Sequence, residues 1–503
     1  MQGKQVLALG PGVPEQRHVG QHPLGLYILF FTEMWERFAY YGMRALLVYY
    51  MTKHLFLPEW KAKVLGHAAL MAGLSRVFGD LDVKQQSSQV YGLYTAFVYL
   101  TPLAGGYIAD RYIGQRKSVY VGGVVMGAGL FTLMWEHLFY VGLVLLIVGN
   151  GFFKPNISTQ VGSLYPKGDA RRDRAFMIFY VGINLGAFLS PFICGTLGES
   201  ARFGWAWGFG SAGVGMVGGL ALYTFGQRYL APDNVMKRSK EMVEVTRKAE
   251  GGAYRDGEVK DLVPAKPKPA PFTSEERGRI VALLVLCALN IVFWAVYEQQ
   301  GNTLALWADG NTDRHLLGFE IPASWFQAVN PAMIFLFTPF INSLWARQNA
   351  RGKEPSSVAK MAIGCFFLAL SFLIMIGGAR AYESGQLASM WWLVACTGLL
   401  TIGELYLSPI GLSLVTKVSP PRIVSLMMGM WFISSFFGNY LSGFLGIFWD
   451  KMSKTTFFLM LSGLSLATGI TMILLMIPLK RALGDENANA DEAPPPAPES
   501  APA

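Results

Sequence analysis

Long apolar segments alternate with short polar ones along most of the chain. A bilayer core about 30 Å thick needs about 20 consecutive apolar residues for a helix to cross it, so each long segment predicts a membrane-spanning helix. The pattern predicts about twelve spans in two sets of about six. The first set covers 24–51, 87–109, 118–137, 139–163, 174–198 and 205–229. The second set covers 277–308, 323–347, 357–378, 388–416, 423–447 and 455–480. We therefore expect an all-α integral membrane protein.

Polar segments divide the chain. Residues 231–275 are strongly charged and include "VPAKPKPAP", which is typical of a cytoplasmic linker with a Pro-rich tether. The N-terminal tail, 1–23, is polar, and the acidic, Pro-rich tail, 483–503, is predicted to be disordered. The linker joins a predicted bundle over 24–230 to a second bundle over 276–482. Two such halves are typical of a major facilitator transporter, whose sites lie near the midplane between them.

Composition supports a membrane protein, because 52% of the residues are hydrophobic and only 15% are charged. A net charge of +9 would also suit a nucleic-acid-binding protein, but the basic residues gather in alternate loops. This asymmetry predicts a multi-pass protein of a bacterial inner membrane with both termini in the cytoplasm. The basic loops contain Arg111, Arg116, Lys117, Lys167, Arg171, Arg172, Arg174, Arg347, Arg351 and Lys353.

Two further features refine this prediction. Residues 52–86 carry several basic side chains on the predicted outer side, and their mixed apolar spacing predicts a helix that lies in the membrane interface. The cysteines stand singly in apolar segments, without the spacing of a disulfide framework or a metal site. We therefore expect no cofactor and no metal.

Ionisable residues interrupt the first predicted span. The segment "FTEMWERFAYYGMR" places Glu33, Glu36, Arg37, Tyr40 and Arg44 on one side of a helix, at about 100° per residue. A charge near the bilayer centre costs about 2.5–3.5 kcal/mol, so several in one span require a polar cavity or charged partners. The stripe predicts an ion or substrate pathway, and a structural ion-pair network is the alternative.

Lone charges also occur in three other spans. Lys154 lies in "GFFKPN", Glu298 in "FWAVYEQQGNT" and Glu404 in "GELYLSPIGLS". Opposite charges from different halves predict a gate, because an ion pair across the halves would hold one side shut. Protonation of its carboxylate would release it. No histidine lies in the middle of a predicted span, so carboxylates are expected to handle any proton.

Several of these segments resemble the signatures of the proton-dependent oligopeptide transporter family, within the major facilitator superfamily. "EMWERF" from Glu33 resembles the ExxERF signature, "GGYIADRYIGQRKSV" from Gly105 the second signature, and "FYVGINLGAF" from Phe179 the helix 5 signature. "GFFKPNIST", "FWAVYEQQG", "GELYLSPIGLS" and "MGMWFISS" match in order. The resemblance implies symport of di- and tripeptides with protons, by a protein that is not an enzyme and that acts as a monomer in the bilayer.

The resemblance also implies roles for particular residues. The basic side of the pocket would contain Arg37, Arg44 and Lys154, and the acidic side would be Glu404, which meets the peptide ammonium. Asn184 and Asn330 would form hydrogen bonds with the peptide. The pockets for substrate side chains would be lined by Tyr41, Tyr99, Trp294, Trp431 and Ser435.

The implied gates are two ion pairs between the halves. Lys154 and Glu404 would pair near the cytoplasmic gate, and Arg44 and Glu298 near the external one. Coupling to protons would involve Glu33, Glu36 and Glu298, together with Arg37 and Lys154. The order in which these carboxylates accept a proton stays open, because their titrations are coupled.

Other interpretations stay open for parts of this set. Tyr99, Trp294 and Trp431 could be aromatic residues that only pack between helices, and Asn184 could be a polar contact between helices. A carrier of nitrate or another small anion on the same fold would keep the basic side but would not need Glu404. An enzyme would need a nucleophile or metal constellation, and the sequence contains no such pattern. Nucleic acid is not an expected partner.

Overall fold

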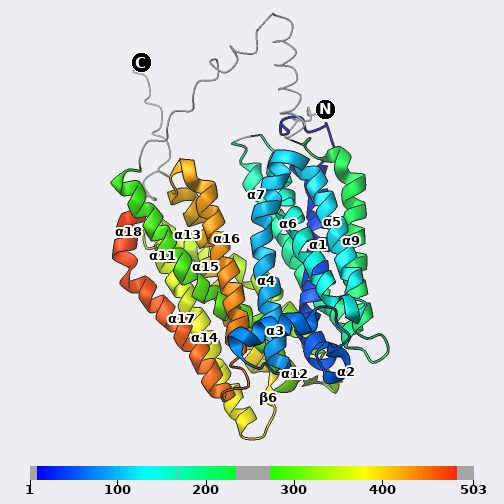
Figure 1. Ribbon diagram of the computed structural model, residues 1–503. Helices are drawn as coiled ribbons and strands as arrows, with labels where there is room; N and C mark the ends of the chain where they lie inside the picture. The colour runs from blue at the N-terminus through cyan, green and yellow to red at the C-terminus, as the bar shows by residue number, and fades with distance from the viewer. Residues whose placement is uncertain (1–7, 167, 234–271, 484–503) are drawn as a thin grey trace, which may run out of the picture.

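The computed structural model describes residues 8–166, 168–233 and 272–483. The tail 484–503, residues 1–7 of the N-terminal tail and most of the predicted linker, 234–271, lie outside the described residues. Two bundles of long helices stand beside each other (Figure 1). The first bundle contains α1 Leu24–Tyr50, α4 Val83–Ile108, α5 Gln115–Thr132, α6 Phe139–Ser163, α7 Arg171–Ser190 and α9 Trp205–Gly226. The second contains α11 Ser274–Tyr297, α13 Val329–Ala350, α14 Ser357–Glu383, α15 Met390–Val418, α16 Val424–Gly446 and α17 Lys454–Leu474.

These helices correspond one by one to the predicted spans. Nine helical segments among the described residues are long and apolar enough to cross a membrane. Three further long helices, α1, α4 and α5, occupy the remaining predicted spans. Helix α1 carries the charges of the stripe within its length, which lowers its mean hydropathy. The two bundles are called the first and second halves below.

Short elements connect the long helices. The short α-helices are α2 Pro58–Lys61, α3 His67–Phe78, α8 Thr196–Glu199, α12 Thr303–Gly310 and α18 Met476–Leu483. The 3-10 helices are Glu136–Leu138, Gln227–Tyr229, Glu298–Gly301, Ala323–Ala328 and Pro421–Ile423, and the π-helices are Met51–Leu55, Ala109–Ile113 and Pro191–Gly195. In the described part of the chain, six two-residue strands form three pairs: β1 His18–Val19 with β2 His22–Pro23, β3 Thr312–Asp313 with β6 Ala388–Ser389, and β4 His315–Leu316 with β5 Phe319–Glu320.

The predicted interfacial segment, 52–86, contains a helix. Helix α3 buries His67 and Leu74 on one side and exposes Ala69, Ala72 and Arg76 on the other. Such two-sided character is typical of a helix that lies along an interface rather than across it. The helix therefore has the form that the sequence predicts.

The two halves meet along two helix pairs, α4 with α16 and α7 with α13. Gly92 of α4 and Gly443 of α16 allow the first pair to touch, because a Cβ atom on Gly92 would lie 2.7 Å from the Cα atom of Gly443. Figure 1 shows α4 and α16 close together near α3 and separated toward the other end. We call the end where α1 and α11 begin the terminal end, and the end near α3 and α12 the far end.

One predicted span is broken in the structure. The sequence predicts a continuous helix over 277–308, but α11 ends at Tyr297 and α12 begins at Thr303. The backbone of Asn302 leaves the helical region, with φ of −112° and ψ of −94°. Gly301 approaches Tyr91 of α4 so closely that a Cβ atom there would lie 1.9 Å from the tyrosine hydroxyl oxygen. The predicted span is confirmed as the membrane-spanning segment Ser274–Gly310, but its helix is interrupted, and the interruption places Glu298 beside the first half.

Candidate functional site

The charged stripe of α1 begins with a buried cluster of three ionisable side chains. Glu33, Glu36 and Arg37 are 2%, 0% and 4% exposed. The Arg37 Nε atom lies 2.9 Å from Oε1 of Glu33 and 2.5 Å from Oε2 of Glu36. Two carboxylates therefore share one guanidinium. The second carboxylate oxygens, Oε2 of Glu33 and Oε1 of Glu36, are buried without a hydrogen-bond partner among the described residues.

The stripe continues to an ion pair between the halves. Arg44 of α1 forms an ion pair with Glu298, at the end of α11. The Tyr91 hydroxyl of α4 accepts hydrogen bonds from Arg44 Nε at 2.8 Å and from Nη2 at 2.6 Å. The same hydroxyl lies 3.4 Å from Oε2 of Glu298. Arg44 and Glu298 are therefore in contact as the resemblance implies, and their role as a gate stays a prediction.

Further contacts close the far end between the halves. Lys53 lies 2.5 Å from Asp309, and Lys84 lies 3.0 Å from Asp450. Glu199, at the end of α8, accepts hydrogen bonds from the backbone N–H groups of Ala323 at 3.1 Å and Ser324 at 2.8 Å. Each contact joins a residue of the first half to one of the second.

Lys154 and Glu404 do not form the implied ion pair in this structure. The Lys154 ammonium lies over the Tyr99 ring, 4.9 Å from its centroid. Glu404 accepts hydrogen bonds through Oε2, from the Tyr297 hydroxyl at 2.6 Å and from Asn330 Nδ2 at 3.1 Å. The helices α4 and α16 of the two halves separate toward the terminal end. Lys154 and Glu404 therefore each contact residues of their own half instead of each other. No described residue donates a hydrogen bond to the other oxygen of Glu404, Oε1.

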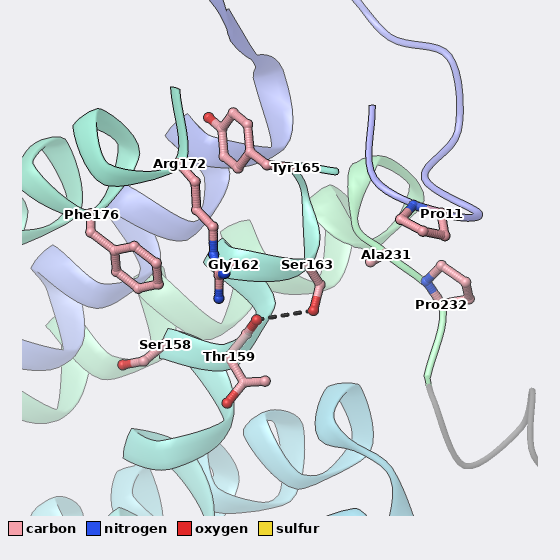
Figure 2. A pocket seen from close by; sticks show the side chains of 10 residues that line it. All are labelled: Pro11, Ser158, Thr159, Gly162, Ser163, Tyr165, Arg172, Phe176, Ala231 and Pro232. Carbon is pink, nitrogen blue, oxygen red and sulfur yellow. Dashed lines mark hydrogen bonds between the residues drawn. The ribbon is translucent and has the colours of Figure 1, made fainter. Parts of the chain in front are cut away.

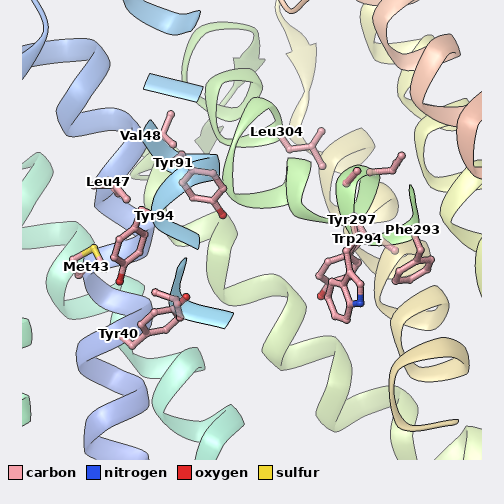
Figure 3. Packing of buried hydrophobic residues seen from close by; sticks show 14 of the residues in the cluster. Tyr40, Met43, Leu47, Val48, Tyr91, Tyr94, Phe293, Trp294, Tyr297 and Leu304 are labelled. Atoms are coloured by element: carbon pink, nitrogen blue, oxygen red, sulfur yellow. The ribbon is translucent and has the colours of Figure 1, made fainter. Parts of the chain in front are cut away.

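A cavity of about 120 Å³ lies between the halves, and we call it the central cavity. Eight of the predicted residues line it: Tyr41, Arg44, Tyr99 and Asn184 from the first half, and Trp294, Glu298, Asn330 and Glu404 from the second. Figure 3 shows aromatic side chains of this region, with Tyr40, Tyr91 and Tyr94 on helices of the first half and Trp294 and Tyr297 on α11. The cavity therefore combines a cation, two carboxylates, amides and aromatic walls.

The chain is similar to known membrane transporters over most of its length. A family model described as the POT family matches residues 116–460. The chain belongs to the POT family. It is 35% identical to YclF, an uncharacterized transporter of Bacillus subtilis, over 94% of this chain and 97% of that protein. It is 32% identical to the di-/tripeptide transporter of Lactococcus lactis subsp. cremoris, over 94% and 98% of the two chains. A crystal structure of the peptide transporter POT in complex with sulfate has a TM-score of 0.76 at 30% identity, over 94% and 98% of the chains.

Membership of the POT family confirms the predicted fold class. The protein is an all-α integral membrane protein with the major facilitator fold, and it belongs to a family of transporters. The central cavity lies between the halves, where the fold places its transport sites.

Four of the residues predicted for substrate binding do not line the central cavity of this POT family protein. Arg37 is held by Glu33 and Glu36, and Lys154 lies behind the Tyr99 ring. Trp431 is 5% exposed, and a Cβ atom on Gly411 would lie 2.3 Å from its ring. Ser435 donates a hydrogen bond to the Trp431 backbone oxygen at 3.4 Å. Trp431 and Ser435 therefore pack between helices in this conformation, the alternative that the sequence left open for Trp431.

Several residues of the cavity were not predicted. Tyr180, Tyr297, Gln300 and Gln327 line it, and Tyr91 holds Arg44 beside it. Tyr297 directly precedes Glu298 in the quoted motif "FWAVYEQQG", so its position was available in the sequence. A buried tyrosine hydroxyl needs a polar partner. A tyrosine next to a charged residue within a predicted span is therefore the sequence signal that could have identified Tyr297.

A larger cavity, of about 550 Å³, lies at the terminal end (Figure 2). Its lining includes the Arg172 side chain and the hydroxyls of Ser158, Thr159 and Ser163, together with Pro232, all of them outside the second half. A carrier of the POT family exposes its site by movement of one half against the other. No residue of the second half lines this cavity, so movement between the halves would not open or close it. The central cavity, which both halves line, is therefore the candidate transport site.

Proposed function

We propose that the protein carries di- and tripeptides across the membrane together with protons, by alternating access to the central cavity. One observation carries the proposal: Glu404 lines the cavity with one oxygen held by Tyr297 and Asn330 and the other without a donor. The oxygen without a donor, Oε1, can accept a hydrogen bond from an ammonium group of the substrate. The relatives named as di-/tripeptide transporters agree with this substrate.

The first half offers the complementary charge. Arg44 lines the same cavity, and the Lys154 ammonium lies behind Tyr99. A peptide of two or three residues is a zwitterion whose ends lie within about 10 Å, at about 3.3–3.6 Å per residue. Its ammonium would meet Glu404, and its carboxylate would meet the cations, for which the planar guanidinium of arginine is well suited.

Proton coupling would use the buried carboxylates of α1. Glu33 and Glu36 share a single guanidinium, and the Lys154 ammonium acts on both through its charge. A substrate carboxylate that attracts Lys154 would weaken this attraction and so favour proton uptake by the pair. Glu298 would take part through its ion pair with Arg44, whose loss opens the far end.

The conformation indicates a direction for alternating access. Contacts between the halves close the far end, and α4 and α16 separate toward the terminal end. The terminal end carries the basic loops, which supports a cytoplasmic position for it in a bacterial inner membrane. The structure would then be a state closed to the outside. We expect the protein to function as a monomer, with protons as its coupling ion.

Transport of a small anion such as nitrate is the alternative on this fold. An anion would use Arg44 and Lys154 but would leave the Glu404 carboxylate facing the same cavity without a cationic partner. The negative charge of the Glu404 carboxylate opposes binding of an anion and favours binding of a substrate with an amine. The geometry therefore supports peptide transport better than anion transport.

Uptake of labelled dialanine into proteoliposomes, with and without an inward proton gradient, tests the proposal. We expect accumulation that collapses with a protonophore and is blocked by peptides but not by free alanine or nitrate. Glu404→Gln should reduce dialanine affinity by about tenfold or more, since an ionic hydrogen bond contributes about 1.5–3 kcal/mol. Glu320→Gln, in the exposed strand β5, is the matched control. Competition by nitrate without any peptide uptake would move the function to the anion class.

A further inference from the structure

A second cavity adjoins the central cavity on the side of the terminal end. It has a volume of about 400 Å³ and lies between α13 and α15, with Tyr180 of α7 at its edge. Its walls are mainly apolar and include Ile341, Trp345, Leu405 and Leu412. We call it the α13–α15 cavity.

Proline residues and aromatic packing explain why this space exists. Helices α13 and α15 contain Pro339 and Pro409, and a proline inside a helix removes a backbone hydrogen bond and bends the helix. The Trp345 and Tyr406 rings pack edge-to-face, with 5.2 Å between their centroids. The Lys360 ammonium lies 4.2 Å from the centroid of the Trp345 ring. Trp345 is therefore held in place from behind and forms a fixed wall.

The two cavities share two residues. Glu404 and Tyr180 line both the central cavity and the α13–α15 cavity. Leu405 and Leu412 follow Glu404 on α15, so the α13–α15 cavity extends from this carboxylate toward the terminal end. A group bound at Glu404 thus lies at the junction of the two spaces.

We propose that the α13–α15 cavity receives the apolar side chain of the first residue of a bound peptide. This inference rests on the proposed function, in which Glu404 binds the ammonium group. The side chain of the first residue branches from the carbon that carries this ammonium, so it starts at the junction. The backbone must run through the central cavity toward Arg44, which leaves the α13–α15 cavity as the adjoining space for the side chain.

The chemistry of the walls selects the class of side chain. Aliphatic and aromatic walls favour a large apolar group, because burial removes its surface from water. Thr338, Asn342 and Ser408 add polar atoms to the lining, so a tyrosine or methionine side chain would also find partners. The side chain of the second residue has no access to this space when the ammonium is held at Glu404. The structure therefore assigns a preference for bulky apolar residues at the first position.

Two isomeric dipeptides test this preference, because Phe-Ala and Ala-Phe differ only in the position of the aromatic ring. The measurement is inhibition of labelled dialanine uptake by each isomer, in the wild type and in Leu412→Trp, which fills the α13–α15 cavity from its edge. We expect Leu412→Trp to weaken inhibition by Phe-Ala about tenfold and to leave Ala-Phe and dialanine within about twofold, values that correspond to about 1.4 and 0.4 kcal/mol.

Two further variants control the result. Leu412→Ala keeps the cavity open and should retain inhibition by Phe-Ala. Leu336→Trp places the same bulk on α13 at an exposed position outside the cavity and should change neither isomer. Equal loss of both isomers in Leu412→Trp, or no loss of Phe-Ala, would overturn the inference while dialanine uptake still supports the proposed function. Absence of dialanine uptake by the wild type would overturn both.

Discussion

The Tyr91 hydroxyl is the most informative single group to remove, because it holds the ion pair that closes the far end. It accepts two hydrogen bonds from Arg44, at 2.8 and 2.6 Å, and Tyr91 is 0% exposed. Tyr91→Phe keeps the ring and deletes these bonds. We expect this variant to shift the protein toward states that are open at the far end.

The magnitude follows from the chemistry of the lost contacts. A hydrogen bond to a charged group contributes about 1.5–3 kcal/mol. The Arg44 side chain is 14% exposed, so water can replace part of the lost interaction and the lower value applies. A change of about 1.5 kcal/mol corresponds to about a tenfold rise in the ratio of open to closed far ends.

Pulsed electron paramagnetic resonance can measure this ratio as a distance distribution. Spin labels at Ala69→Cys and Gln386→Cys would report the separation of the halves at the far end, since both positions are exposed. The native cysteines, Cys194, Cys287, Cys365 and Cys396, are buried and should not react. Tyr107→Phe is the matched control, because Tyr107 is an exposed tyrosine of the same helix that binds Arg111. Identical distributions for the wild type and Tyr91→Phe would refute the reasoning.

Three other variants test the same region and the proton cluster. Gly301→Ala should displace the Tyr91 hydroxyl, which would lie 1.9 Å from the new Cβ atom, and should open the far end about tenfold or more on the same spin-label measurement. Gly310→Ala, in α12, meets no atom within 4 Å and should have no effect. Glu33→Gln and Glu36→Gln should retain peptide counterflow better than proton-driven uptake, because each removes a proton acceptor but keeps the fold. Equal loss of both activities, with Glu59→Gln unchanged, would indicate a structural ion-pair network instead.

The sequence was sufficient for most of the fold. A span such as 139–163 is visible as an apolar segment, and α6 covers Phe139–Ser163. The break after Tyr297 was not predicted, although the polar segment EQQGN, residues 298–302, with its glycine marks the place where α11 ends. The close approach of Gly301 to Tyr91 accompanies the break, and this contact links residues of different halves. Such a contact has no signature in the local pattern of either segment.

The site was predictable where it depends on charge. Arg44, Glu298 and Glu404 stand out in the sequence because charges within spans are costly and therefore need a cavity or a partner. Aromatic residues carry less information, since a ring suits both a cavity wall and a helix interface. Trp294 lines the cavity and Trp431 packs on α15 at Gly411, although both looked alike in the sequence.

Asp450 provides a test that separates closure of the far end from proton coupling. It lies between α16 and α17 and contacts Lys84 of the first half at 3.0 Å and Lys454 at 2.7 Å. Burial raises the pKa of Asp450, but the two ammonium groups outweigh this effect and hold the pKa below its ordinary value. A carboxyl group with a lowered pKa contributes stability above its ordinary pKa of about 3.9 and loses it only as the pH falls through the lowered value.

The contact between Lys84 and Asp450 is therefore constant between about pH 5 and pH 8, the range over which we expect proton-driven uptake to vary. Asp450→Asn should open the far end to a similar extent at every pH in this range and should leave the pH optimum of dialanine uptake in place. The spin-label distances and the pH profile of uptake check the two parts separately, with Asp313→Asn at the exposed end of β3 as the control. A shifted pH optimum in Asp450→Asn would place proton sensing at the far-end contacts. An unchanged optimum would leave proton sensing with Glu33 and Glu36 of α1 or with the two carboxylates of the central cavity, Glu298 and Glu404.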